Sequence, residues 1–175
     1  KDEATRVASR SGGIFTALSD QVLSNGGVVY GCVLTDKFDA VHIRADNEKD
    51  RNRMRGSKYI QSKLGDTFKS VKADLDAQNS VLFSGTSCQV AGLKKYLGKE
   101  YDNLFCVDIV CHGVPSPKIW RKYISSLSPS LNFTYISMKD KSDSWRGYKI
   151  RIKGEIDFVN EKASKNMYML AFAQN

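Results

Sequence analysis

The chain has 175 residues, of which 41% are hydrophobic, 26% charged and 10% aromatic, a composition that excludes a largely disordered protein. The formal net charge is +8, but no block of five or six like charges occurs, so nucleic acid is not the favoured partner. No apolar run reaches the roughly 18 to 20 residues of a membrane span, and no signal-peptide core follows the charged start. We therefore expect a cytoplasmic protein without a membrane partner.

The first part of the chain predicts a helix, a hairpin and a long loop. Apolar residues at helical spacing follow Gly13 and end at Asn25, which predicts a helix between them. Residues 28–34 and 40–45 are strand-like and are joined by a short polar turn, a pattern typical of an antiparallel hairpin. Residues 46–63 are polar, basic and poorly periodic, and they predict a long loop of the kind that is often functional.

The rest of the chain predicts helices alternating with strands. We expect helices at about 66–77, 88–97 and 116–127, and strands at 81–84 and 105–110. Residues 133–138 and 148–153 predict two more strands around a charged loop, and residues 167–172 predict an apolar helix face. The predicted fold class is α/β: a mixed sheet with a parallel β-α-β-α core flanked by helices, plus an antiparallel hairpin.

Two of the four cysteines stand just beyond strand ends. Cys88 lies in the turn that joins strand 81–84 to the next helix, and Cys111 follows strand 105–110. Ligands of open α/β sheets bind beyond the carboxyl ends of the strands, so the two thiols predict a metal or redox site. Cys32 and Cys106 lie within apolar strands and are predicted to be core residues.

Two other classes of function fit the same residues. The net charge and the loop from Arg44 to Lys63 are compatible with a basic module that binds nucleic acid or another polyanion. Cys88 with His112 is compatible with a cysteine-nucleophile transferase or hydrolase. A complete zinc site is not favoured because the chain has no C-x-x-C, and Cys88 with Cys111 would supply only two of the four thiolates of a 4Fe-4S cluster.

One ordered set of motifs spans nearly the whole chain, at residues 11–18, 26–31, 55–62, 81–93, 107–117 and 139–141 with Trp145. Taken together, these motifs resemble the coenzyme F420 hydrogenase/dehydrogenase beta subunits, a family of flavin and iron-sulfur proteins. Ser87 departs from the family's pattern, which commonly has a proline before the cysteine of the Gly-Thr-Pro-Cys-Gln motif.

The resemblance implies an oxidoreductase subunit that passes electrons between a deazaflavin or other reduced carrier, FAD and a 4Fe-4S cluster. It also implies a redox partner subunit or ferredoxin-like domain. It identifies no catalytic residue. The residues implied for FAD are Ser11, Gly12, Gly13, Lys58, Tyr59, Gln61, Gly85, Thr86 and Gln89, and those implied for the metal are Cys88 and Cys111.

The resemblance also divides the chain. Residues from about 6 to 79 correspond to the family's N-terminal segment, and residues from about 80 to 175 to the start of its C-terminal segment. The family's C-x-x-C segment would follow the last residue. We therefore expect one partial catalytic domain from a longer protein, which by itself is inactive and holds no complete cluster.

Overall fold

The structure, a computed structural model, describes residues 2–173 and divides into two compact units. Unit 1 contains the segment up to Gly13, residues 56–61 and the segment from Gly113 onward. Unit 2 contains residues 14–55 and 62–112. Both tryptophans lie in unit 1, and all four cysteines lie in unit 2. The expected division at residues 79 and 80 concerns likeness to family segments, and it stays a prediction.

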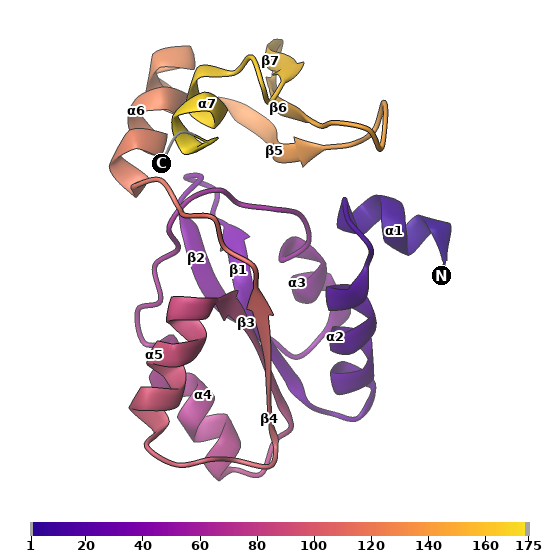
Figure 1. The fold of residues 1–175 in the computed structure, drawn as a ribbon, viewed down its shortest axis with the longest axis vertical. Helices are drawn as coiled ribbons and strands as arrows, with labels where there is room; N and C mark the ends of the chain where they lie inside the picture. The colour runs from indigo at the N-terminus through magenta and orange to yellow at the C-terminus, as the bar shows by residue number, and fades with distance from the viewer. Residues whose placement is uncertain (1, 174–175) are drawn as a thin grey trace. The chain divides into compact units, whose positions relative to one another are not determined.

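Unit 2 is built on a four-stranded mixed sheet with the strand order β2-β1-β3-β4 (Figure 1). The first two strands form the predicted antiparallel hairpin, in which Cys32 pairs with His42. The pairs β1-β3 and β3-β4 are parallel, as expected of a β-α-β-α series. The predicted fold class is therefore confirmed. The strands are β1 (Val28–Leu34), β2 (Ala40–Ala45), β3 (Val81–Thr86) and β4 (Leu104–Ile109).

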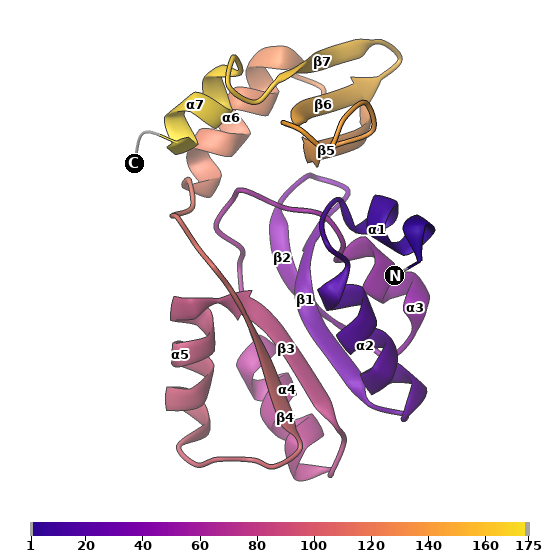
Figure 2. The ribbon, with the colours of Figure 1, turned by 45° about the vertical axis from the view of Figure 1, so that its right-hand side comes forward.

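Helices cover both faces of this sheet (Figure 2). On one face, Val71, Leu75 and Leu93 pack against Val81 and Phe83. On the other face, Val22 and Met54 pack against strand residues that include Leu82. This two-sided burial explains why β1 and β3 are nearly continuous apolar runs. The helices on the first face are α4 (Thr67–Asp76) and α5 (Ser87–Leu97), and those on the second are α2 (Ile14–Ser24) and α3 (Glu48–Arg53).

The prediction of an unbroken loop over residues 46–63 is wrong, because it contains α3. Asn47 caps the start of this helix, and its side-chain oxygen accepts a hydrogen bond from the backbone N–H of Asp50. Its buried side chain is Arg51, which is 1% exposed and donates to the Thr16 carbonyl and the Ser19 hydroxyl. The helix is anchored by a polar side chain in place of an apolar stripe, so hydrophobic periodicity could not reveal it.

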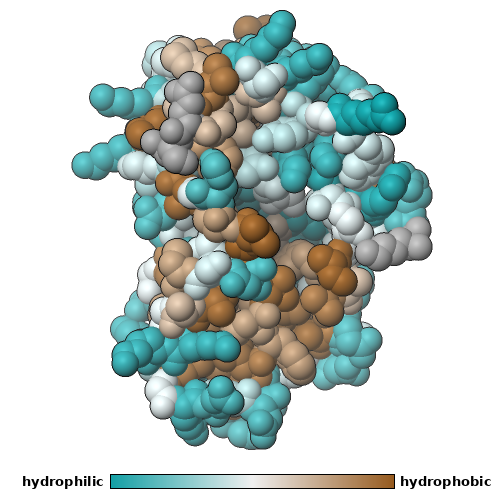
Figure 3. Space-filling view, viewed as in Figure 1, coloured by the Kyte–Doolittle hydropathy of each residue, from teal (hydrophilic) through white to brown (hydrophobic). Residues whose placement is uncertain are grey.

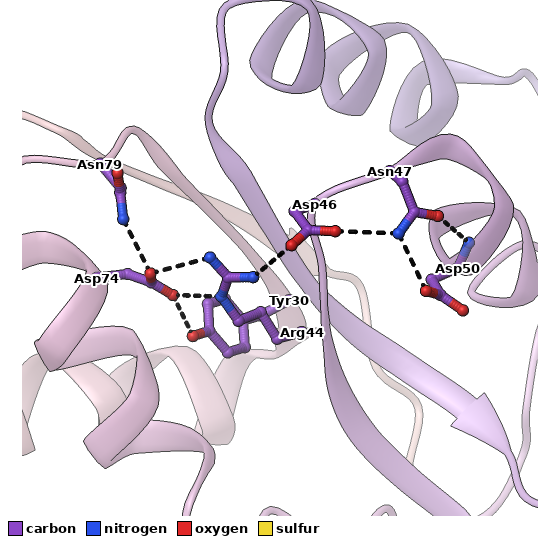
Figure 4. Close-up of polar contacts among 7 residues, drawn as sticks. All are labelled: Tyr30, Arg44, Asp46, Asn47, Asp50, Asp74 and Asn79. Carbon is purple, nitrogen blue, oxygen red and sulfur yellow. Dashed lines mark hydrogen bonds and ion pairs between the residues drawn. The ribbon is translucent and has the colours of Figure 1, made fainter.

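A polar network connects the hairpin to α4 (Figure 4). Arg44 on β2 donates to Asp74 on α4 over 2.8 Å, and the hydroxyl of buried Tyr30 donates to the same carboxylate over 2.5 Å. Burial and the Asp74 carboxylate raise the pKa of Tyr30, which keeps the hydroxyl a donor. The network fixes the hairpin against the helix. It also includes Asp46, Asn47, Asp50 and Asn79.

Unit 1 contains a separate antiparallel sheet with the order β5-β6-β7. Sequence patterns missed β7, since Val159 is its only buried residue, and α1, which has none and is capped by Asp2. The predicted apolar helix at 167–172 is present. The elements are α1 (Glu3–Ser9), α6 (Pro117–Leu127), β5 (Phe133–Asp140), β6 (Lys149–Gly154), β7 (Asp157–Lys162) and α7 (Met167–Ala173).

The core of unit 1 joins α6 and α7 through aromatic side chains. Trp120 is 1% exposed, and its ring lies 5.0 Å from that of Tyr168 in an edge-to-face arrangement. The ring of Tyr123 stacks on Tyr168 at 5.3 Å, and its hydroxyl accepts a hydrogen bond from Asn166. Such pairs add to the free energy gained from burial alone, so they hold the two helices together.

Apolar side chains also gather on one visible face of unit 2, in the lower part of Figure 3. Among the helices of residues 2–173, none is long and apolar enough to cross a bilayer. The large exposed apolar residues of unit 2 are Ile14, Leu18, Tyr96, Phe105, Ile109 and Val110.

Candidate functional site

The turn from β3 into α5 is tightly packed on its inner side. Gly85 is buried, and a Cβ atom there would lie 2.9 Å from a ring carbon of Phe83 and 3.1 Å from the Gln89 side-chain oxygen. A larger residue would therefore displace the Gln89 amide. Glycine is required here by close approach, since the backbone is not in the left-handed region.

Thr86 and Gln89 form a capping box at the start of α5. The Gln89 side-chain oxygen accepts the Thr86 backbone N–H over 3.0 Å, which fixes the orientation of the amide. The Thr86 hydroxyl lies 3.2 Å from the Cys88 thiol, and Cys88 is exposed. The sequence thus places a solvent-accessible thiol on a braced helix start.

The other end of the Gln89 amide reaches into the unit. Its NH₂ group donates to the Ser62 hydroxyl over 2.8 Å, and that hydroxyl lies 3.0 Å from Nδ1 of His42. Nε2 of His42 lies 3.0 Å from the carbonyl oxygen of Ser84 on β3. Both polar ends of the Gln89 amide therefore have partners within unit 2, and its role as a cofactor contact stays a prediction.

Cys111 occupies the matching place beyond the neighbouring strand. Thr86 and Ile109 are register partners in the parallel pair β3-β4, and Cys88 and Cys111 each stand two residues further on. Both thiols are free and exposed. Because the Ser87 hydroxyl also donates to Asp108 over 2.9 Å, the turn is tied to β4. Both thiols thus lie just beyond the carboxyl ends of adjacent parallel strands.

The remaining two cysteines lie elsewhere. Cys32 and Cys106 are half-buried within β1 and β4, and Cys106 packs against the core on the α5 side. Burial raises the pKa of the Cys106 thiol and so disfavours the thiolate that a metal requires. Within residues 2–173, no group of three or more His, Cys, Asp or Glu side chains is placed to hold a metal ion. These residues do not fit a complete 4Fe-4S cluster by themselves.

The residues predicted at the start of α2 belong to unit 1. Ser11 and Gly12 are exposed, whereas Gly13 is buried with φ +84°. A Cβ atom at Gly13 would meet the Thr5 methyl group at 3.4 Å, and the positive φ itself favours glycine. The exposed pair lies just before a helix start, where proteins commonly bind phosphate, and its cofactor role stays a prediction.

Tyr59 is held from several sides within unit 1. Its N–H donates to the Met138 sulfur over 3.1 Å, and its carbonyl accepts the Tyr168 hydroxyl over 2.6 Å. Its ring lies 4.7 Å from that of Phe172. Tyr59 therefore anchors the segment, with the half-buried Lys58 before it and the exposed Gln61 after it. The cofactor roles of these three residues stay predictions.

Lys141 and Trp145, both from the last of the matching motifs, line a hollow of about 150 Å³ in unit 1. Arg10, from beyond α1, donates to the Asp140 carboxylate over 3.0 Å and to the Tyr135 hydroxyl over 2.9 Å. The cations of Arg6 and Lys141 lie 4.4 and 5.0 Å from the centre of the Trp145 ring. These contacts connect the start of the chain to a loop about 130 residues later.

Sequence reasoning missed His42, Ser62 and Arg10. The signal for His42 was a polar residue at a core-facing position of an alternating strand, since β2 buries Ala40 and His42 alike. Such a residue needs internal hydrogen-bond partners. Neither Ser62 nor Arg10 had a comparable signal, because their partners lie far along the chain.

The basic segment from Arg44 to Lys63 has much of its positive charge paired with carboxylates. Arg51 pairs with Asp20, Arg53 with Asp50, and Lys63 with Asp39. Arg44 is held by Asp74 and Asp46. These internal ion pairs leave less positive charge for a polyanionic ligand.

Parallel strands flanked by helices, with two exposed thiols beyond their carboxyl ends, define an α/β protein in its architecture. Residues 78–156 match the family model for the C terminus of the coenzyme F420 hydrogenase/dehydrogenase beta subunit. The match confirms the resemblance to this beta subunit family and covers the Cys88 turn and Cys111.

The fold is similar to that of a solved chain from the F420-reducing NiFe hydrogenase complex of Methanosarcina barkeri. The TM-score is 0.61 at 18% sequence identity, and the similarity covers 89% of this chain and 55% of that chain. This chain thus spans about half the length of that structure. A comparison with curated proteins gives no match.

Proposed function

We propose that this chain is part of a flavin-dependent oxidoreductase subunit that passes electrons between a reduced carrier, FAD and an iron-sulfur cluster. The carrier would be a deazaflavin or another small molecule. The observation that carries the proposal is the equal placement of Cys88 and Cys111 beyond β3 and β4, with both thiols free and exposed. The family match over residues 78–156 supports the same assignment.

In this proposal Cys88 and Cys111 supply two of the ligands of a 4Fe-4S cluster. Such a cluster needs four thiolates, so the remaining ligands would come from outside the described residues. The flavin would exchange two electrons with the carrier and single electrons with the cluster. The chain's own part is to hold and orient the cofactors.

For FAD, the proposed contacts are the small and hydroxyl residues at two helix starts, together with the segment around Tyr59. The exposed residues Ser11 and Gly12, just before α2, would lie near a phosphate, and so would the first turn of α5. Thr86 is half-buried beside that turn. A redox partner subunit or ferredoxin-like domain would accept the electrons.

The test is an absorbance spectrum of the natural protein, purified without oxygen, compared with those of Cys88→Ser and Cys111→Ser. We expect flavin and cluster bands in the natural protein, and each substitution should abolish the cluster band while leaving the flavin band. Cys106→Ser is the matched control and should keep both, because this thiol is half-buried against α5. A folded natural protein with neither band would refute the proposal.

A further inference from the structure

We propose that His42 is a positioning residue for the Cys88 turn and acts through Ser62 and Gln89. Four hydrogen bonds form an ordered series within unit 2. They lead from the Ser84 carbonyl to the His42 ring, then to Ser62, to Gln89 and finally to the N–H of Thr86.

The direction of each hydrogen bond follows from its end groups. The Ser84 carbonyl can only accept, so Nε2 of His42 carries a hydrogen. The Thr86 backbone N–H can only donate, so the oxygen of Gln89 faces it and the NH₂ group faces Ser62. The Ser62 hydroxyl accepts from Gln89 and is left to donate to Nδ1 of His42. The series therefore selects the neutral Nε2–H tautomer.

Packing and backbone pairing bring these groups together. His42 is 8% exposed and stacks on Phe83 at 5.5 Å. The backbone of Lys63 pairs with β2 on either side of Val41, accepting from the His42 N–H and donating to the Ala40 carbonyl. That pairing places Ser62 beside the ring. A neutral ring with neutral partners also suits a buried site.

The series positions groups and does not conduct protons, because an amide side chain and a backbone N–H do not accept and pass on a proton. Its effect is on the turn. With both ends held, the Gln89 amide fixes Thr86, whose hydroxyl meets the Cys88 thiol at 3.2 Å. A buried residue on β2 thus determines how rigidly an exposed thiol is presented.

The experiment measures the alkylation rate of Cys88 in the metal-free natural protein, with the rate at each cysteine read from its own peptide. Ser62→Ala removes the central hydroxyl, and we expect Cys88 to react about five- to tenfold faster, the factor that corresponds to one lost hydrogen bond. Ser62→Thr retains a hydroxyl and should restore the natural rate. Ser70→Ala is the matched control, since its hydroxyl donates to a backbone carbonyl outside the series.

Cys32 and Cys106 report general unfolding in the same samples, because both are half-buried in the sheet. Their rates should stay unchanged in Ser62→Ala. An unchanged Cys88 rate would overturn the inference, and so would an equal acceleration at Cys106, which would mean that the whole unit loosens.

A second measurement does not depend on stability. The ¹⁵N spectrum of the His42 ring should show the Nε2–H tautomer with a hydrogen-bonded Nδ1, and Ser62→Ala should shift the Nδ1 signal. Finding the Nδ1–H tautomer would contradict the assigned directions. The inference rests on the proposed function only in treating Cys88 as a functional thiol. The expected rates in a protein that binds neither flavin nor cluster would remove the proposed function and leave the positioning role intact.

Discussion

Each unit contains a cluster of one arginine, one aspartate and one tyrosine, and the two clusters differ in which member is buried. In unit 2, Tyr30 is 1% exposed, while Asp74 and Arg44 lie nearer the surface. In unit 1, Asp140 is 4% exposed and Arg10 is partly solvated. The same three residue types thus join distant segments in both units, but only the cluster of unit 1 has a fully buried carboxylate.

The difference indicates where each cluster is vulnerable. A buried carboxylate is stabilised only by its partners, so losing either side leaves an uncompensated group in a low-dielectric site. A carboxylate near the surface can regain water when a partner is lost. The cluster of unit 1 should therefore be more sensitive to the loss of its carboxylate than the cluster of unit 2.

Asp140→Ala should produce the largest effect. The substitution leaves Arg10, Tyr135 and the Ser142 N–H without their common acceptor, and we expect unit 1 to lose about 3 kcal/mol of stability. Hydrogen exchange of the β5 and β6 amides under increasing urea would measure it. Asp143→Ala, which removes the exposed partner of Lys149, should cost no more than about 0.5 kcal/mol. Equal losses for the two variants would contradict the role of burial.

Asp74→Ala should have a smaller effect, about 2 kcal/mol, measured from the β1 and β2 amides. It removes the acceptor of Tyr30, Arg44 and Asn79, but Arg44 is 39% exposed and water compensates part of the loss. Asp46→Ala is the control and should cost no more than about 0.5 kcal/mol, since Asp46 is 62% exposed. If Asp74→Ala lost more stability than Asp140→Ala, the more deeply buried carboxylate would not be the more important one.

When a tyrosine hydroxyl is removed, we expect unit 2 to lose more stability than unit 1, which is the reverse of the order for the aspartate substitutions. Tyr30→Phe removes a donor from a fully buried ring, and we expect a loss of about 1 kcal/mol in unit 2. Tyr135→Phe should cost about 0.5 kcal/mol in unit 1, because Tyr135 is half-buried and Asp140 keeps its other donors. The same exchange measurements apply, and an opposite order would show that burial of the hydroxyl does not determine its contribution.

Lowering the pH should produce the smallest differences in stability between the natural protein and its variants. Burial acts to raise the pKa of Asp74, but hydrogen bonds from Arg44, Tyr30 and Asn79 bring it below its ordinary value. The pKa of Asp140 is likewise lowered, since Ser142, Arg10 and Tyr135 outweigh the effect of burial. A carboxyl with a lowered folded-state pKa contributes stability above its unfolded pKa of about 3.9 and loses it as the pH falls through the folded value.

We therefore expect Asp74→Asn and Asp140→Asn to lose less stability than the natural protein when the pH is lowered from about 5 to 2. Urea unfolding at several pH values would measure this difference. Parallel pH profiles for the natural protein and both variants would show that neither carboxylate contributes to the acid sensitivity.

Local patterns were enough to predict much of the fold. The hairpin, the parallel pair β3-β4 and helices α2, α4, α5 and α6 follow from apolar periodicity and turn residues. The elements α3, β7 and α1, which bury one residue or none, carry no such pattern. Their positions depend on Arg51, on strand pairing and on an aspartate cap, which become visible only in three dimensions.

The candidate site likewise has a part that the sequence predicts and a part that it does not. The cysteines beyond β3 and β4 were predictable, because strand ends and helix starts are local signals. The His42 series was not, since it joins β2, the Ser62 segment and α5 across more than 40 residues. Hydrogen bonds between such distant residues leave no periodic trace in a sequence.

The unequal distribution of tryptophan and cysteine gives each unit a natural label. Trp120 and Trp145 lie in unit 1, whereas the four thiols lie in unit 2. Tryptophan fluorescence therefore reports on the antiparallel sheet and its helices, and it does not report on the sheet that ends before Cys88 and Cys111. A thiol-reactive dye has the opposite selectivity. Two optical signals could thus follow the two units separately without any amino-acid substitution.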